Sequence, residues 1–203
     1  MSFYELATLD TVIFGGGKAA PGIEAWVASG AGRLCGAWGT DVGSLNRVYV
    51  LRAFDDVATL MAERERALRS DNPFGCAEHL VGLQMDSYRG ADFRPGVLTG
   101  ALGPVYEIRT YRPRIGNLTP LMAAWKEAVP EREAYSKMAV AMFSLDGALR
   151  YTQIWPYASL EERTRARGQS VTDGKWPPKG GPGFLTPEMT SDIALPLPFS
   201  PLK

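Results

Sequence analysis

The side chains best suited to chemistry alternate along two stretches in the second half of the chain. They are Glu107, Arg109 and Tyr111 in the first stretch, and Tyr151, Gln153 and Trp155 in the second. A carboxylate, a guanidinium and an amide beside aromatic rings can orient a small, mostly apolar, oxygen-bearing ligand. The same groups can instead form an internal ion pair that only fixes how two sheets dock, and both interpretations stay open.

Two residues are candidates for a catalytic role. His79 is the only histidine, and an imidazole can act as an acid or a base near neutral pH. We expect its strand to place it beside Val81 and Leu83 on the side packed by helices, which makes a structural histidine the alternative. Arg109 is the second catalytic candidate.

Composition argues against several classes of protein. Lys plus Arg equals Asp plus Glu at 22 each and the pI is about 6.6, whereas a nucleic-acid binder carries a basic face. No apolar run reaches the ~18 residues of a membrane span. One histidine and two cysteines supply no zinc constellation, and we expect no cofactor. Without a secretory signal, Cys35 and Cys76 are predicted to be buried thiols of a cytoplasmic protein.

Gly15-Gly16-Gly17-Lys18 superficially resembles a phosphate-binding loop. That motif also requires a glycine at position 12 and Ser or Thr at position 19, where this chain has Val12 and Ala19. We interpret the glycines as a flexible turn between a strand and a helix.

The chain contains an internal repeat, and this repeat predicts which strands and helices carry the candidate site residues. Residues 4–5 match 106–107, residues 17 and 26 match 116 and 125, and residues 51–54 match 154–157. Each copy shows the order strand, helix, strand, strand, helix, strand. Predicted strands span 3–9, 33–40, 45–53 and 79–85, then 105–112, 137–144, 149–155 and 193–198, the last at a sheet edge because of its prolines.

Helices are predicted between these strands. The first spans residues 21–29, and the second follows Asp55 and Asp56 as cap residues. The third begins at residue 118 and is limited by Pro130. The fourth begins at Ser159, which forms a capping box with Glu162. The arginines of this fourth helix, at positions 163, 165 and 167, are interpreted as a solvated face.

The repeat predicts an α+β fold. Two tandem ferredoxin-like βαββαβ units pack their antiparallel sheets face to face into a barrel within one chain. The expected boundaries are 1–88 for the first unit, 89–103 for a linker and 104–203 for the second unit. A Gly/Pro-rich loop at 174–187 carries Trp176 and Phe184, and we expect these rings either to pack over a cavity or to lie in a structureless insertion.

Strand alternation separates two faces on each sheet. We expect the apolar set, which includes Tyr106 and Ile108, to pack against the helices. The set that carries Glu107 and Arg109 would then face the barrel interior. Buried charges need partners, so we predict ion pairs between Glu107 and Arg109, and between Glu5 and Arg52.

Three stretches carry a resemblance to a known family. They are Tyr106-Glu107-Ile108-Arg109-Thr110-Tyr111, the run from Ile154 to Arg163, and Pro198-Phe199-Ser200-Pro201-Leu202. At these residues the chain resembles the NIPSNAP family, more closely in the second half, since Arg52 stands where a tryptophan is usual. The resemblance implies a dimeric α+β-barrel fold with both units in one chain. That superfamily also contains cofactor-free monooxygenases, haem-degrading enzymes and stress-response proteins.

Three functional hypotheses follow. The first is binding of a small, partly apolar molecule in the barrel interior, with a cofactor-free oxygenase or isomerase as the enzyme class. The second is a non-catalytic scaffold that binds partner proteins. The third, haem binding, is disfavoured because His79 is the sole histidine. The expected partner is a small molecule rather than nucleic acid or a membrane, and a homo-oligomer would form through outer edges or helices.

Overall fold

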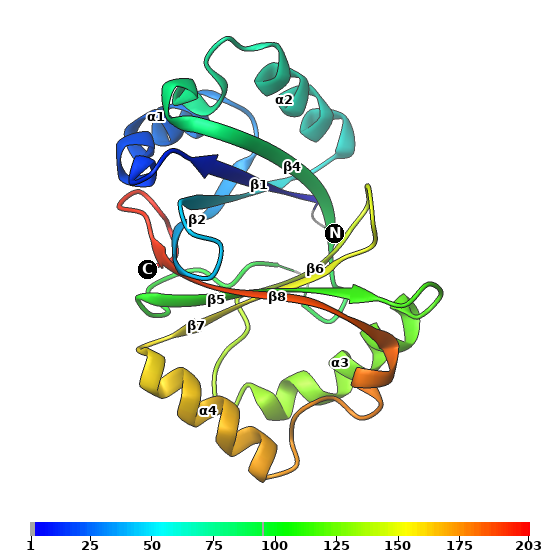
Figure 1. Cartoon of the computed structure of the whole chain (residues 1–203). Coiled ribbons are helices and arrows are strands. Elements are labelled where there is room, and N and C mark those ends of the chain that lie inside the picture. The colour runs from blue at the N-terminus through cyan, green and yellow to red at the C-terminus, as the bar shows by residue number, and fades with distance from the viewer. Residues whose placement is uncertain (1–2, 95) are drawn as a thin grey trace.

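The computed structural model describes residues 3–94 and 96–203, which form two units of the same order (Figure 1). The first unit contains β1 (Phe3–Thr11), α1 (Gly15–Ser29), β2 (Arg33–Val42), β3 (Arg47–Phe54), α2 (Val57–Arg69) and β4 (Leu80–Gly90). The second contains β5 (Val105–Pro113), α3 (Leu118–Arg132), β6 (Val140–Ser144), β7 (Tyr151–Tyr157), α4 (Leu160–Thr172) and β8 (Leu185–Pro196). Three short 3₁₀ turns are η1 (Pro73–Gly75), η2 (Ala77–His79) and η3 (Gly181–Phe184).

The strands close into a barrel in the order β1-β3-β2-β8-β5-β7-β6-β4. Within each unit the strands are antiparallel, and the units join where β2 pairs with β8 and β4 pairs with β6. Helices α1 and α2 cover the outer side of one sheet, and α3 and α4 cover the other (Figure 1). The predicted α+β barrel of two ferredoxin-like units is therefore confirmed. The edge position predicted for the last strand is wrong, because β8 pairs with both β2 and β5.

The predicted assignment of the two sheet faces is wrong. Tyr4, Leu6, Tyr106 and Ile108 pack together with residues of both units, so they face the barrel interior. The alternate set, which includes Tyr111, packs with the helices of its own unit. Alternation identifies which residues share a face but not which face is inside. Because both faces are buried here, polarity could not decide between them.

The helix boundaries follow local sequence signals. Asp56 caps α2 by accepting a hydrogen bond from the Thr59 amide at 2.8 Å, as predicted. Ser159 caps α4 by accepting from the Glu162 amide at 3.1 Å, and the Glu162 carboxylate accepts from the Ala158 amide. In a capping box, this carboxylate accepts a hydrogen bond from the backbone N–H of the cap residue itself. Here it accepts from the residue before the cap, so the predicted capping box forms with its second hydrogen bond shifted by one residue.

Two helices extend beyond their predicted limits. Helix α1 starts at Gly15 rather than at Pro21, directly after Phe14 in the left-handed conformation at φ 57°. A Cβ on Gly15 would lie 2.9 Å from the Thr11 Cβ, so the helix start needs a residue without a side chain to approach β1. Helix α3 continues through Pro130 to Arg132.

A buried ion network joins the first sheet to its helices. Arg52 of β3 donates to Glu5 of β1 at 2.7 Å and to Glu63 of α2 at 2.8 Å, and the Glu5 and Arg52 side chains are fully buried. The predicted pairing of Glu5 with Arg52 is confirmed. Burial would raise the pKa of Glu63, but hydrogen bonds from Arg66 and Arg52 outweigh it and lower the pKa.

This network yields a prediction about stability. Arg52→Ala removes the positive charge that is paired with two buried carboxylates, so it should lower the free energy of unfolding by about 3–5 kcal/mol. Arg69→Ala removes an exposed ion pair with Glu65 and should cost less than about 1 kcal/mol. Urea titrations of the two variants measure the difference. Equal losses would contradict a structural role for the buried network.

Candidate functional site

The six residues singled out in the sequence form a ladder across two neighbouring strands. In the register of β5 and β7, Glu107 lies opposite Trp155, Arg109 opposite Gln153 and Tyr111 opposite Tyr151. Their side chains lie on the outer face of the second sheet, under α3 and α4, and not in the barrel interior. The structure therefore brings all six together, on the opposite side of the sheet from the one predicted.

Glu107 is the charged centre of this ladder. Its Oε1 accepts from Arg109 at 2.5 Å, from Arg163 of α4 at 2.5 Å and from Ser191 of β8 at 2.7 Å. The Arg167 guanidinium lies 3.5 Å from Oε2. Burial would raise the pKa of Glu107, but the hydrogen bond from Arg163 and the charges of Arg109 and Arg167 outweigh it and lower the pKa to about 2.

The predicted Glu107–Arg109 pair is thus confirmed, and the interpretation of the α4 arginines as a solvated face is wrong for two of them. Arg163 and Arg167 are one helical turn apart and reach the same carboxylate. This i, i+4 spacing was the available sequence signal. Arg165, between them, is exposed.

Aromatic side chains cover the other end of the ladder. Trp125 of α3 contacts the Tyr151 ring with centroids 5.6 Å apart, and Trp176 contacts Trp125 at 5.7 Å and Trp155 at 5.9 Å. Phe184 packs against the same cluster. The expectation of an ordered loop whose rings pack is therefore the correct one of the two alternatives for segment 174–187.

His79 does not join this ladder. It ends η2, before β4 begins at Leu80, and its Nε2 lies 3.6 Å from a carboxylate oxygen of Glu78. The predicted place of His79 within the strand is wrong, because the chain forms a 3₁₀ turn there. In the described parts of the chain, no hydrogen bond or ion pair connects His79 with the six residues.

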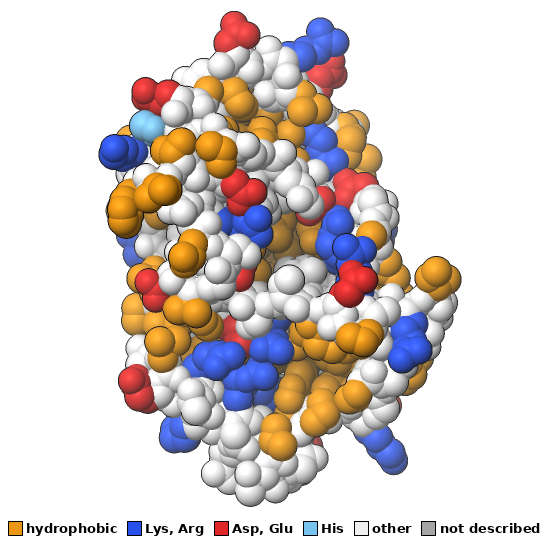
Figure 2. Space-filling view, in the orientation of Figure 1, with side chains coloured by type: hydrophobic (Ala, Val, Ile, Leu, Met, Phe, Trp, Pro, Cys, Tyr) orange, Lys and Arg blue, Asp and Glu red, His pale blue; other side chains and the backbone are white. Residues whose placement is uncertain are grey.

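A separate pocket of about 430 Å³ lies between the two sheets. Its walls come from both units, and the residues that line it include Leu6, Tyr49, Asp86, Tyr88, Thr110 and Arg150. Figure 2 shows charged side chains of both signs at mid-height of the molecule, where the two units meet. Sequence reasoning missed this pocket. The available signal was that the inward set Tyr106, Ile108, Thr110, Arg112 changes from apolar to polar along one strand.

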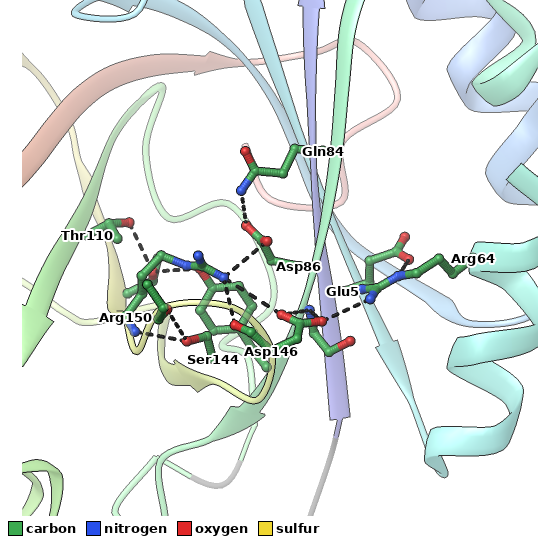
Figure 3. Close-up of polar contacts among 12 residues, drawn as sticks. Glu5, Arg64, Gln84, Asp86, Thr110, Ser144, Asp146 and Arg150 are labelled. Carbon is green, nitrogen blue, oxygen red and sulfur yellow. Dashed lines mark hydrogen bonds and ion pairs between the residues drawn. The ribbon is translucent and has the colours of Figure 1, made fainter. Parts of the chain in front are cut away.

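A polar network crosses one wall of this pocket (Figure 3). Arg150 lies 3.1 Å from an Asp86 oxygen and 3.7 Å from Asp146, and Asp146 accepts from Arg64 of α2 at 2.9 Å. Gln84 donates to the same Asp86 carboxylate at 2.8 Å. The network therefore links the pocket to the helix-covered face of the first sheet.

The carboxyl groups of this network differ in their tendency to hold a proton. Burial raises the pKa of Asp86, although the Arg150 charge opposes that shift. Burial would also raise the pKa of Asp146, but hydrogen bonds from Arg64 and the Ser87 amide lower it. A carboxylate with a raised pKa beside a fixed cation is suited to accept a proton from a ligand.

Phenolic hydroxyls complete the polar part of the pocket. Tyr49 donates to Asp192 at 2.6 Å, and burial together with this bond raises the pKa of Tyr49. The Tyr88 hydroxyl lies 3.4 Å from Arg150 Nε and 3.3 Å from the Thr152 hydroxyl. Because the Tyr88 hydroxyl accepts both of these bonds, its own hydrogen can be donated to an oxygen atom of a ligand.

Within residues 3–94 and 96–203, no three side chains of His, Cys, Asp or Glu group as metal ligands. No helix in the same part of the chain is both long and apolar enough to cross a membrane.

Comparison with protein families gives a match in both halves of the chain. The NIPSNAP family model matches residues 4–78 and 106–201. The chain belongs to the NIPSNAP family. The two matched stretches each contain one copy of the repeat, so the resemblance seen in the sequence is confirmed for both halves. No curated protein matches the chain.

Solved structures similar to this NIPSNAP protein share its fold over almost the whole chain. A candidate monooxygenase from Lactobacillus acidophilus NCFM has a TM-score of 0.66 and 11% identity, with 96% of this chain and 93% of that chain covered. An anthrone oxidase-like protein has a TM-score of 0.66 and 10% identity, with 97% and 91% covered. A candidate monooxygenase from Fusobacterium nucleatum has a TM-score of 0.63 and 8% identity, with 97% and 92% covered.

The charges around Glu107 predict how the stability of this NIPSNAP protein depends on pH. The folded-state pKa of about 2 lies below the ordinary value of 4.5. The ionised carboxylate therefore stabilises the fold above pH ~4.5, and this contribution is lost as the pH falls toward 2. We expect Glu107→Gln to lower the free energy of unfolding by about 3 kcal/mol at pH 7 and by little near pH 2.

Urea titrations of wild type and Glu107→Gln at several pH values between 7 and 2 measure this difference. Glu127→Gln is the matched control, because this exposed glutamate of α3 forms no ion pair among the described residues. The free energies of unfolding of wild type and Glu107→Gln could instead differ by the same amount at every pH. That result would show that the ionised carboxylate does not stabilise the fold.

Proposed function

We propose that the protein binds a small, partly apolar, oxygen-bearing molecule in the pocket between its two sheets. The observation that carries the proposal is the pocket of about 430 Å³, whose walls join both units inside a closed barrel. Ligand sites combine apolar walls with a few convergent polar groups. Leu6 and the rings of Tyr49 and Tyr88 supply apolar walls, and Asp86 and Arg150 supply opposite charges.

The same pocket supports a reaction class. Asp86 would remove a proton from a carbon next to a ligand carbonyl, so that the C–H bond breaks and an O–H bond forms on Asp86. The electron pair moves to the carbonyl oxygen, and the Arg150 guanidinium would stabilise the enolate. An isomerase returns the proton to another atom of the molecule. A cofactor-free oxygenase instead adds O₂ to the enolate carbon, and the resulting peroxide anion takes the proton back from Asp86 to give a hydroperoxide.

Fold similarity to candidate monooxygenases and to an oxidase-like protein agrees with this class. Because identities of 8–11% show only the fold, and one fold supports many reactions, the similarity does not define the chemistry. The proposed reaction class therefore rests on the position of Asp86 and Arg150 in the pocket. As the two free cysteines are buried, we also propose a reducing, cytoplasmic location.

The proposal predicts catalysed exchange of an acidic C–H proton. In D₂O, the wild-type protein should accelerate deuterium incorporation into cyclohexanone, which exchanges its C–H protons slowly by itself, as measured by proton NMR. Asp86→Asn removes the base and should reduce the acceleration about 10²–10⁴-fold. Binding of the same ketone should raise the melting temperature of wild type.

A blocking variant separates binding from chemistry. Thr190 lies at the exposed rim of the pocket, so Thr190→Trp should abolish both exchange and the thermal shift. Glu65→Trp, on the exposed face of α2, should change neither. If wild type shows neither exchange nor a shift, or if Thr190→Trp retains both, the pocket is not the binding site.

A non-catalytic interaction role is the second candidate, and an exposed apolar patch favours it. The patch combines the β1–α1 turn with its neighbours, and its most exposed members are Ile13 at 74%, Phe14 at 85%, Leu45 at 66% and Val81 at 70%. The Asn46 side chain accepts from the Phe14 amide at 3.2 Å, which holds the two turns together. Exposed patches of this kind mark interfaces.

If a second copy of the chain covers this patch, the wild-type protein should sediment as a dimer. Phe14→Ser should shift the sedimentation coefficient to that of a monomer, because it removes the most exposed apolar ring. Ile115→Ser, at a fully exposed position in the second unit, is the matched control. A monomeric wild type would exclude self-association through this patch.

A further inference from the structure

The outer face of the second sheet holds more positive than negative charge. Arg109, Arg163 and Arg167 all direct their guanidinium groups to Glu107. Arg132 adds a fourth cation, whose charge interacts with those of Arg167 and Glu107. Three guanidinium groups thus share one carboxylate, and a fourth lies near them without a carboxylate of its own. In Figure 2 a group of Lys and Arg side chains surrounds an acidic one where α4 meets β8.

Arg132 is the least compensated of these cations. Its side chain comes from α3 and is 1% exposed. It donates to the Ser136 hydroxyl at 2.8 Å and to the Tyr157 hydroxyl at 3.4 Å, both neutral groups. In the described ranges no carboxylate lies within ion-pair distance of it. A buried cation without an anion is costly, so the site favours a negatively charged occupant.

Gln153 supplies an unused hydrogen-bond donor in the same place. The Trp155 indole N–H can only donate, so the atom it contacts at 3.2 Å must be the Gln153 carbonyl oxygen. The amide nitrogen Nε2 is then left without a partner, although the residue is fully buried. Gln153 lines a narrow pocket together with Arg109, Arg132, Arg167, Trp155 and Trp176, and with Trp176 in place this pocket has no room even for a water molecule.

The walls of this pocket are aromatic and flat. Trp155 forms its floor on the sheet, and the Arg132 guanidinium lies 4.8 Å above that ring and 5.8 Å from Trp176. Trp176 belongs to the loop between α4 and η3. Gly174 and Gly180, on either side of it, both have positive φ values of 68° and 74°, a conformation that glycine adopts without strain. Movement of Trp176 would enlarge the narrow pocket.

We propose that this pocket is a second binding site, which takes a small aromatic carboxylate. Guanidinium forks match a carboxylate with paired hydrogen bonds. The groups that would hold the carboxylate are Arg109, Arg132 and Arg167, with Gln153 Nε2 as an uncharged donor. The aromatic body of the ligand would lie between Trp155 and Trp176 in place of their present contact. This site lies on the opposite face of the sheet from the pocket between the sheets.

Calorimetric titration with benzoate tests the proposal on the full-length protein. Wild type should bind benzoate, and the neutral isostere benzamide should bind at least tenfold more weakly. Arg167→Gln, a partly exposed position, should weaken benzoate binding about tenfold, as expected for loss of one charge-assisted contact. Gln153→Leu tests the amide donor in the same way. Arg165→Gln, on the exposed side of the same helix, should leave the affinity unchanged.

The location is measured independently by the indole N–H signals of the five tryptophans in ¹H–¹⁵N NMR spectra. Benzoate should shift the signals of Trp155 and Trp176, assigned with Trp155→Phe and Trp176→Phe, and leave that of Trp38 in the barrel interior unchanged. Circular dichroism confirms that each variant is folded. Equal binding of benzamide, equal affinity of Arg167→Gln, or binding of inorganic phosphate without benzoate would each overturn the proposal.

Discussion

Burial of both faces of the sheet is the constraint on which the rest of this structure depends. Closure of eight strands buries the inner side, and the helices of each unit bury the outer side. A charge near the middle of a central strand therefore cannot reach bulk water and has to be neutralised by other parts of the protein. Glu5 and Glu107 occupy matching positions in the two copies, and both side chains are fully buried. Each has to be neutralised by neighbouring arginines.

The two copies meet this requirement with different elements. In the first copy the cation is Arg52, directly opposite Glu5 on the adjacent strand, and Glu63 of α2 balances it further. In the second copy the residue opposite Glu107 is Trp155, which carries no charge. Arginines of α4 replace the missing strand cation. Because a tryptophan stands on the strand and the arginines come from the helix, the second copy has an aromatic surface on the sheet and an excess of guanidinium groups above it.

Sequence comparison of the copies predicted much of this arrangement. It established the order of elements, the matching glutamates, and the pairing of Glu5 with Arg52 and Glu107 with Arg109. It could not establish which face of the sheet is inside, because alternation is the same viewed from either side. It also missed Asp86 and Arg150, which come from different units and meet only where β4 lies beside β6. No local pattern records that contact.

The seam between β4 and β6 also explains why the pocket between the sheets is polar although the rest of the interior is not. Trp38 and Tyr106 pack 5.4 Å apart in that interior, with Leu202 in the same cluster. At the seam, the Ser87 amide donates to Asp146 instead of to a neighbouring strand. Asp146 in turn binds Arg64 and lies near Arg150. Because a short seam leaves backbone groups unpaired, side chains have to satisfy them. The charged wall of the pocket is therefore a consequence of how two duplicated sheets close into one barrel.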